Sequence, residues 1–341
     1  MNINVKTITL FLLSYTLQLK GQETTITGKP YFTVASFNCE NLFDTLRDTI
    51  ATKPELLLES DDFLPGGSHR WNRGRLWDKL RNIAKIIAAL DSEYPVDVIC
   101  LEEVENDTIV DWLVNRTQLR RLGYHYHVTH SHDKRGIDIA VLYQPFSIRM
   151  LQTRSIHVPE MFQTRDMIHF SGEAYITHRS DSNGIAMPDT IDIIGVHLPS
   201  KLGGTESKWK RAAVCGLLRT EIDSIYRSRS EASVIALGDF NDGPESQALR
   251  YLTDTSHTPA LTNLFSDVRG TYKYQGIWET IDQVLINEDS RLHVGYADAV
   301  WMDWLMESDA KYGGWKPRRS FLGPVWHGGV SDHMPILVRF Y

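Results

Sequence analysis

The segment "SVIALGDFND", residues 233–242, places two aspartates and one asparagine directly after a short apolar run. The run is rich in branched aliphatic residues, which predicts a buried β-strand. Asp239 and Asn241 are two positions apart, so their side chains lie on one face of an extended chain. A turn would need only one such residue. The segment therefore predicts a strand that ends in a cluster of polar groups.

Seven other apolar runs also predict strands, and two segments have a helical period. The helical stripes cover residues 76–90 and 212–225. Because helices are few relative to strands, the chain does not alternate regularly between strand and crossover helix. We expect a layered α/β (α+β) fold with mixed sheets. The seven runs are YFTVASF (31–37), VDVICL (96–101), IDIAVLY (137–143), EAYIT (173–177), DIIGVHL (192–198), IDQVLI (281–286) and PILVRFY (335–341). Residues 44–75 predict a long surface loop with turn signals at residues 65–67.

The N-terminus predicts export. An apolar run from Ile8 to Leu19 follows Lys6 and is too short to span a bilayer comfortably, so residues 1–22 resemble a secretory signal peptide. The alternatives are an uncleaved membrane anchor or a frayed terminus. We expect residues 23–341 to form a single domain that is secreted or periplasmic, monomeric, and without a stable membrane span after cleavage.

Composition narrows the classes of function. The 341 residues are 42% hydrophobic and carry a formal net charge of −7. Such a balance gives no chain-wide basic surface for tight, non-specific nucleic-acid binding, although a local basic patch remains compatible with it. Three cysteines without a C-x-x-C spacing make a disulfide framework unlikely to be the basis of the fold.

Polar side chains collect at the ends of the predicted strands. Four runs deliver them at their C-terminal ends, and two runs near the C-terminus of the chain carry them at their starts. Antiparallel strands start where their neighbours finish, so both sets can meet at one sheet edge. A lone aspartate is usually a turn residue and a lone histidine usually a satisfied core group, so only the combination supports a site. The set comprises Asn38, Glu103, His197, Asp239, Asn241, Asp282, Asp332 and His333.

The chemistry of this set is coherent. Oxygen ligands such as Asn38, Glu103 and Asp332 suit a hard divalent cation, Mg²⁺ or Mn²⁺. Zinc would require more clustered histidine or cysteine. His197 and His333 can transfer protons near neutral pH, and a carboxylate beside each would fix its tautomer. Asp282 and Asp138 are the candidate partners, Asp138 for His197. A metal, an activated water and a proton donor are what phosphate-ester hydrolysis needs.

These motifs resemble the endonuclease/exonuclease/phosphatase superfamily, the fold of pancreatic-type deoxyribonuclease. The resemblance covers about residues 30–341 and implies a four-layer sandwich: two mixed, mainly antiparallel sheets packed face to face and flanked by helices. It also implies one active site at the sheet edges. The motifs, in the family's order, are SFNCENLF (36–43), CLEEVEN (100–106), RGIDIAVLY (135–143), GVHLPSK (195–201), GDFND (238–242), IDQVLI (281–286) and SDHMPI (331–336).

The resemblance also implies metal-binding roles. Glu103 matches the glutamate of the family's "LQEV" motif and would be the main metal ligand, with Asn38 helping to position the ion and Asp332 nearby. Glu102 stands where the family has a glutamine, a departure that would add charge.

For the phosphate, the resemblance implies that His197 faces the scissile group. Asp239 and Asn241 would orient the attacking water and hold the phosphate, and Asp282 would pair with His333. No catalytic position is lost, which argues against an inactive relative.

Basic residues also occur where phosphate would bind. Arg135 precedes one strand and Lys201 follows His197, and we predict that both contact the substrate phosphate. The leading interpretation is an exported Mg²⁺-dependent phosphodiesterase or nuclease. The alternative is a phosphomonoesterase or sphingomyelinase-like phospholipase of the same fold, and a third is a non-catalytic binding protein. Nucleic acid or another phosphate ester would be the partner.

Overall fold

The computed structural model describes residues 29–50, 53–57, 61–177, 179–180 and 182–341. By its contacts, the chain separates into residues 1–30 and a compact unit of residues 31–341. The signal peptide predicted for residues 1–22 lies outside the described residues and stays a prediction. No helix in the described ranges is long and apolar enough to cross a bilayer.

The first sheet carries the N- and C-terminal strands side by side. Its order is β15-β20-β1-β4-β6-β5. β1 runs parallel to β4 and antiparallel to β20, so the sheet is mixed. The bounds are β15 (Val294–Ala299), β20 (Ile336–Phe340), β1 (Phe32–Leu42), β4 (Val98–Val104), β6 (Asp138–Tyr143) and β5 (His125–Val128).

The second sheet repeats this plan. Its order is β11-β14-β10-β9-β8-β7. The central pair β9 and β10 is parallel, while β14 and β8 run antiparallel to it. The bounds are β11 (Leu261–Asn263), β14 (Asp282–Asn287), β10 (Ser233–Asp239), β9 (Asp189–His197), β8 (Met167–Ala174) and β7 (Arg149–Ile156).

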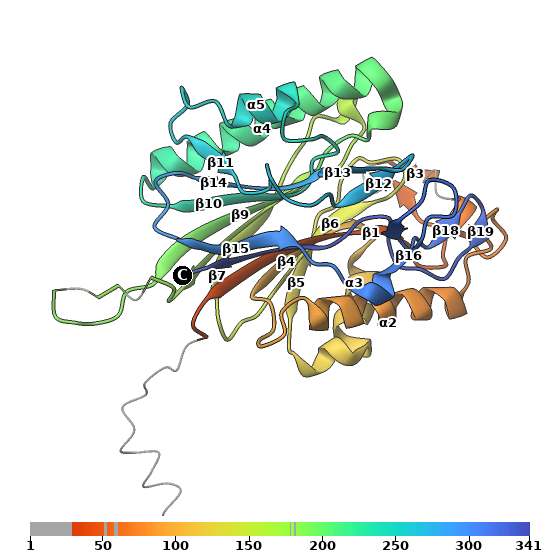
Figure 1. Cartoon of the computed structure of the whole chain (residues 1–341), viewed down its shortest axis with the longest axis horizontal. Helices are drawn as coiled ribbons and strands as arrows, with labels where there is room; N and C mark the ends of the chain where they lie inside the picture. The colour runs from red at the N-terminus through yellow and green to blue at the C-terminus, as the bar shows by residue number, and fades with distance from the viewer. Residues whose placement is uncertain (1–28, 51–52, 58–60, 178, 181) are drawn as a thin grey trace, which may run out of the picture. The chain divides into compact units, whose positions relative to one another are not determined.

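The two sheets pack face to face between two layers of helices. β1 and β4 contact β10, and β6 contacts β8 and β9. Helices α2 (Arg73–Ala89) and α3 (Asp107–Arg116) cover the first sheet, and α4 (Gly204–Ser228) and α5 (Gln247–Leu252) cover the second (Figure 1). The predicted four-layer arrangement is therefore confirmed. Short pieces complete it: β2 (Thr49–Ile50), β3 (Lys53–Leu57), β12 (Tyr272–Tyr274), β13 (Ile277–Glu279), β16 (Met306–Ser308), β17 (Trp315–Pro317), β18 (Phe321–Leu322) and β19 (Val325–Trp326).

Local chemistry explains where the helices begin and which face they bury. Asn72 caps α2, because its side chain accepts hydrogen bonds from the backbone of Gly74 and Arg75. The apolar stripe of α2 packs on the first sheet, and that of α4 packs on the second. Both predicted helices are confirmed. The sequence pattern did not predict α3 or α5, which are short.

Two predictions about local structure are wrong in part. The run EAYIT lies mostly beyond β8, which ends at Ala174. Residues 44–75 are not only surface loop: they contain β2, β3 and a 3₁₀ turn at Asp61–Phe63. Trp71 is fully buried and donates its indole N–H to the Phe43 carbonyl at 2.9 Å. A buried indole with a satisfied donor anchors this segment to the core.

Candidate active site

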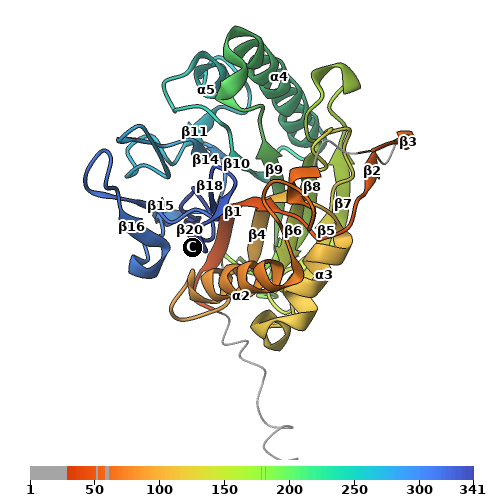
Figure 2. The same cartoon turned by 90° about the vertical axis from the view of Figure 1, so that its right-hand side faces the viewer.

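Strand direction gathers the predicted polar residues at one edge of the two sheets. Asn38, Glu103, His197 and Asp239 lie at or near the C-terminal ends of β1, β4, β9 and β10. Asp282 opens the antiparallel β14, and His333 precedes β20. Figure 2 shows the layers from a second side, with α4 and α5 at the top and α2 and α3 at the bottom. The predicted convergence of these groups is confirmed by the distances below.

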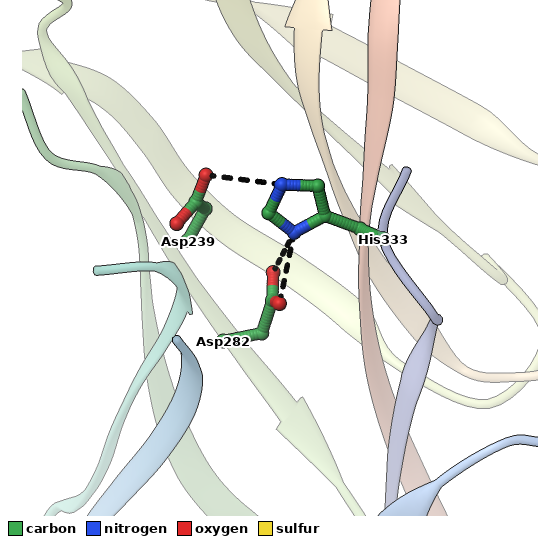
Figure 3. Close-up of side chains that lie close together, drawn as sticks. All are labelled: Asp239, Asp282 and His333. Carbon is green, nitrogen blue, oxygen red and sulfur yellow. Dashed lines mark hydrogen bonds and ion pairs between the residues drawn. The ribbon is translucent and has the colours of Figure 1, made fainter. Parts of the chain in front are cut away.

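A histidine held between two aspartates forms the centre of the site. His333 Nδ1 lies 2.9 and 3.1 Å from the two carboxylate oxygens of Asp282. Its Nε2 lies 3.8 Å from Asp239 Oδ2, on the opposite side of the ring (Figure 3). All three side chains are buried. The predicted pairing of Asp282 with His333 is confirmed, and it fixes the direction in which the second ring nitrogen points.

The electrostatics of this centre are set by burial and by the excess of carboxylates. Burial opposes protonation of His333, but Asp282 and Asp239 outweigh it and raise the pKa of the imidazole well above its ordinary value. Burial raises the pKa of Asp239 to about 7, against the lowering effect of His333. The centre therefore exchanges protons at physiological pH more readily than ordinary carboxylates do.

Asp239 is oriented by three donors. Asn38 Nδ2 donates to Asp239 Oδ2 at 3.0 Å, and Asn241 donates both its backbone N–H, at 2.7 Å to Oδ1, and its side-chain Nδ2, at 3.1 Å to Oδ2. Asn241 adopts a left-handed backbone with φ 50°. This turn lets its backbone and its side chain reach the same carboxylate, which the period-two pattern alone did not predict.

Glu103 comes to the same site through an irregularity in β4. Its φ is 59°, and the ladder to β6 shifts register between residues 102 and 104. Glu103 Oε1 lies 3.9 Å from His197 Nε2, which lies 3.5 Å from Asp239 Oδ2. Glu103 Oε2 accepts the backbone N–H of Asn41 at 2.8 Å. Glu40 and Asn41 also have positive φ, so β1 and β4 both bend where the site begins.

His197 differs from His333 in its surroundings. Burial and the nearby Arg165 and Arg135 lower the pKa of His197 well below its ordinary value, so the ring is neutral. Its Nδ1 is buried and has no hydrogen-bond partner among the described residues. Asp138 does not fill this position, and the predicted contact is wrong. Asp138 Oδ1 instead accepts hydrogen bonds from the Thr129 hydroxyl, at 2.7 Å, and from the Ser131 backbone, at 3.0 Å, which fix a loop.

Asp332 and the two predicted phosphate-binding residues lie at the rim and already have partners. Asp332 Oδ2 is 2.8 Å from Arg319 Nη2, and Arg319 Nε is 3.1 Å from Glu40 Oε1. Lys201 Nζ pairs with Glu279 Oε2 at 3.0 Å. The sequence pattern does not predict that Arg319 pairs with Glu40, because the two residues lie far apart in the chain.

Arg135 is better placed for substrate. Its Nη2 donates to Asn41 Oδ1 at 2.5 Å and lies 3.8 Å from Glu103 Oε2. Among the phosphate-binding candidates, it is the one that touches the Glu103 side of the site.

Glu102 lies in surroundings that disfavour the charge expected from its replacement of glutamine. It is fully buried, and burial raises the pKa of its carboxyl well above the ordinary value, which favours the neutral form. Glu102 Oε1 accepts the Ser36 hydroxyl at 2.6 Å. A neutral carboxyl has one O–H donor where a glutamine amide has two N–H donors, and Glu102 Oε2 has no hydrogen-bond partner among the described residues. Burial thus works against the extra charge that the replacement of glutamine predicts.

The donor set fits a divalent cation. Asp239, Asp282 and His333 offer ligand atoms that all lie within 4.8 Å of one another and can hold a metal. However, His333 and Asp282 already satisfy each other. Glu103 and Asp239 each present a carboxylate oxygen near His197 Nε2, at 3.9 and 3.5 Å, and carboxylate oxygen is the ligand type that Mg²⁺ and Mn²⁺ prefer. Asn38 turns its Nδ2 to Asp239, and its Oδ1 accepts the Glu40 backbone N–H at 2.9 Å. The site thus separates a proton-transfer side from an oxygen-rich side.

Comparison with known proteins places the chain in a family. Residues 33–341 match the model of the endonuclease/exonuclease/phosphatase family. The chain belongs to this family and is a hydrolase that acts on phosphate esters. No curated protein sequence matches it.

Solved structures share the fold. A mannosyl-6-phosphatase from Bacteroides thetaiotaomicron is similar at 15% identity and TM-score 0.54, over 91% of this chain and 99% of that chain. A truncated TDP2 from Caenorhabditis elegans is similar at 16% identity and TM-score 0.52, over 91% and 97%. A Bacteroides thetaiotaomicron protein described by the family name is similar at 14% identity and TM-score 0.54, over 91% and 94%.

Proposed function

We propose that this protein is an exported, Mg²⁺-dependent phosphodiesterase that cleaves nucleic acid. One observation carries the proposal: the buried Asp239 carboxylate is oriented by Asn38 and Asn241 and stands between two histidines of opposite pKa shift. Such a carboxylate can hold an attacking water while the flanking rings contact the phosphoryl oxygens.

The site residues would have three roles: activation of water, contact with the phosphate and binding of the metal. Asp239 and Asn241 orient the water, and Asp239 accepts its proton. Asp282 holds the His333 ring so that Nε2 faces the reacting group, and His197 Nε2 donates a hydrogen bond to a phosphoryl oxygen. Glu103 and Asn38 would hold Mg²⁺, which offsets negative charge on the phosphoryl oxygens when it is bound.

The phosphate-binding roles of Arg135 and Lys201 follow from their places at the rim. Arg135 reaches Glu103 and Asn41, so its guanidinium can contact a phosphate held against the oxygen-rich side. Lys201 is 40% exposed and paired with the partly exposed Glu279, so it would act as a mobile point charge.

A substrate panel tests the function. The mature chain is incubated with plasmid DNA, RNA, bis-p-nitrophenyl phosphate, p-nitrophenyl phosphate and sphingomyelin, each with Mg²⁺ or with EDTA. We expect cleavage of nucleic acid and of the diester, lost with EDTA. Hydrolysis of p-nitrophenyl phosphate alone would instead support a phosphomonoesterase. Hydrolysis of sphingomyelin alone would support a phospholipase. Silence on every substrate, without Mg²⁺ binding, would support a non-catalytic protein.

Export is supported by the apolar run of residues 8–19 and is tested separately. Expression of the full chain in a bacterial host should yield a protein outside the cytoplasm whose N-terminus, determined by mass spectrometry, lies near residue 22. A protein with intact Met1 that stays in the cytoplasm would contradict export without affecting the enzymatic proposal.

A further inference from the structure

A pocket lined by basic side chains lies next to the catalytic residues. It is a cavity with a volume of about 270 Å³, and four basic side chains and one acidic side chain contribute to its wall. We refer to it as the basic pocket, defined by Lys134, Arg135, Arg165 and Lys210 together with Asp133. The whole chain carries a formal net charge of −7, so this local excess of positive charge is opposite to the overall balance.

Two residues that line the basic pocket, Arg165 and Thr164, each have a buried polar atom without a hydrogen-bond partner among the described residues. Arg165 is buried; it donates Nη2 to the Leu198 carbonyl at 2.9 Å, and its Nη1 lies 3.4 Å from Asp133 Oδ2. Its Nε, and the hydroxyl of the neighbouring buried Thr164, have no hydrogen-bond partner in the described part of the chain. A buried guanidinium with an unused donor is costly unless an anion or another acceptor completes its shell.

The N-terminus of α4 adds positive electrostatic potential to the basic pocket. Gly203 precedes α4 and provides no side-chain cap for its first turn, and both Gly203 and Ser207 line the pocket. α4 has 25 residues, so its N-terminal amides carry the full partial positive charge of a long helix. The buried Arg165 and this helix end thus act on the same volume.

The basic pocket shares part of its wall with the catalytic site. The Leu198 carbonyl that accepts Arg165 Nη2 also accepts Asn241 Nδ2 at 2.9 Å. Arg135, which lines the pocket, lies 3.8 Å from Glu103 on the catalytic side. The Leu198 carbonyl and the Arg135 guanidinium therefore lie between the basic pocket and the catalytic residues Asn241 and Glu103.

We propose that the basic pocket binds a second anionic group of the substrate, a phosphate next to the one that is hydrolysed. This rests on the proposed phosphoesterase function and narrows its substrate to esters with at least two phosphates, as in a polynucleotide. The volume of about 270 Å³ is many times the roughly 10–15 Å³ of cavity volume that one water molecule needs, so the pocket has room for a phosphate group. The guanidinium of Arg165 would give the charge-assisted bond, and the lysines would add point charges.

A double variant tests the pocket without touching the catalytic cluster. Lys134→Ala combined with Lys210→Ala removes two cations. Lys210 forms an ion pair with Glu206 of its own helix, at 2.8 Å. Lys208→Ala is the matched control, because Lys208 lies on the same helix, is exposed, and does not line the pocket. Melting temperatures check that all variants fold.

Two substrates separate the pocket from the reaction centre. A thymidine dinucleotide with terminal phosphates offers a second anion, and the same dinucleotide without them does not. We expect the double variant to raise KM about tenfold for the phosphorylated dinucleotide, with kcat and the other substrate unchanged. Lys208→Ala should alter neither. An equal change on both substrates, or no change, would overturn the inference.

A binding measurement keeps the inference testable if neither dinucleotide is cleaved. Inorganic pyrophosphate is titrated into the protein in EDTA by calorimetry. We expect the double variant to bind about tenfold more weakly than the wild type and the Lys208→Ala control. Equal affinity in all three proteins would contradict the basic pocket. If no substrate is cleaved but the double variant still binds pyrophosphate about tenfold more weakly than the wild type, the proposed function is contradicted and the basic pocket is supported.

Discussion

Two of the buried histidine–aspartate pairs in the described part of the chain differ in what completes them. At the catalytic edge, His333 is bonded to Asp282 and faces Asp239. Under α4, His169 Nε2 lies 2.8 Å from Asp192, which also binds Arg229 Nη2 at 2.6 Å. Asp192 and His197 lie on the same strand, β9, five residues or roughly 16 Å apart.

The difference lies in charge balance. Burial alone would raise the pKa of Asp192, but the hydrogen bonds and charges of His169 and Arg229 outweigh it and lower the pKa below its ordinary value of 3.8. Asp239, in contrast, accepts hydrogen bonds from the amides of Asn38 and Asn241 and forms no ion pair with an arginine or lysine in the described part of the chain, and burial raises its pKa to about 7. A buried His–Asp pair is therefore not a sign of catalysis by itself. The sign is a carboxylate whose charge the protein leaves for a ligand to balance.

The largest expected effect comes from removing the uncompensated carboxylate. Asp239→Asn should lower kcat for phosphodiester hydrolysis about 10³-fold, because the group that orients and deprotonates water is lost. This corresponds to about 4 kcal/mol of barrier. The melting temperature should stay the same or rise, because the substitution removes a carboxyl whose charged form is disfavoured by burial. Initial rates and thermal unfolding check both. A variant with more than a tenth of the wild-type rate would contradict the role of Asp239.

The matching change in the second pair should act on stability instead. Asp192→Asn leaves Arg229 and His169 without their shared carboxylate, and the free energy of unfolding should fall by about 2–4 kcal/mol. Urea denaturation measures it, and the rate per folded molecule should equal that of the wild type. If this variant lost activity while it remained folded, the contrast between the two pairs would be wrong.

Glu103 tests whether the oxygen-rich side is a metal site. Groups that merely support metal ligands alter affinity about 10–100-fold when changed. For Glu103→Gln we expect at least about tenfold more Mg²⁺ for half-maximal activity. Titration of the rate with Mg²⁺ measures this. Glu279→Gln is a suitable control, because Glu279 pairs with Lys201 at the rim. An unchanged Mg²⁺ requirement in Glu103→Gln would place the ion elsewhere.

The smallest expected effect depends on pH. Arg229 is 38% exposed, so Arg229→Met should cost only about 1–2 kcal/mol near neutral pH. Because the pKa of Asp192 is depressed in the folded state, the stability that Arg229 provides is present above 3.8 and is lost as the pH falls through the folded value. Urea midpoints of variant and wild type should converge at acid pH. A constant difference would show that Arg229 acts through packing instead.

The sequence predicted the site because its residues stand at strand ends. Strand direction brings Asn38, His197 and Asp239 to one edge, and the antiparallel neighbours bring Asp282 and His333. Glu103 also needs the irregularity in β4, which the sequence pattern does not predict. What the sequence could not predict depends on contacts between distant segments. The burial of Arg165 against Leu198 and the pairing of Asp332 with Arg319 are of this kind.

Weak periodicity explains the missed secondary structure. Strand β7 reads "RMLQTRSI", and only its last residue, Ile156, is buried, so the segment has no apolar alternation that would predict a strand. The predicted contact of Asp138 with His197 is wrong for a different reason. Asp138 does begin the strand β6, but its carboxylate accepts hydrogen bonds from the hydroxyls of Thr129 and Ser131 instead.

The left-handed backbone at Glu40, Asn41, Glu103 and Asn241 limits how this chemistry can be transplanted. Each such residue costs on the order of 1–3 kcal/mol that the surrounding fold must supply. Copying only the side chains onto straight strands of another scaffold would aim the carboxylates away from each other. A designer who wants this reaction in a new protein would have to copy the bends first and provide a core stable enough to hold them.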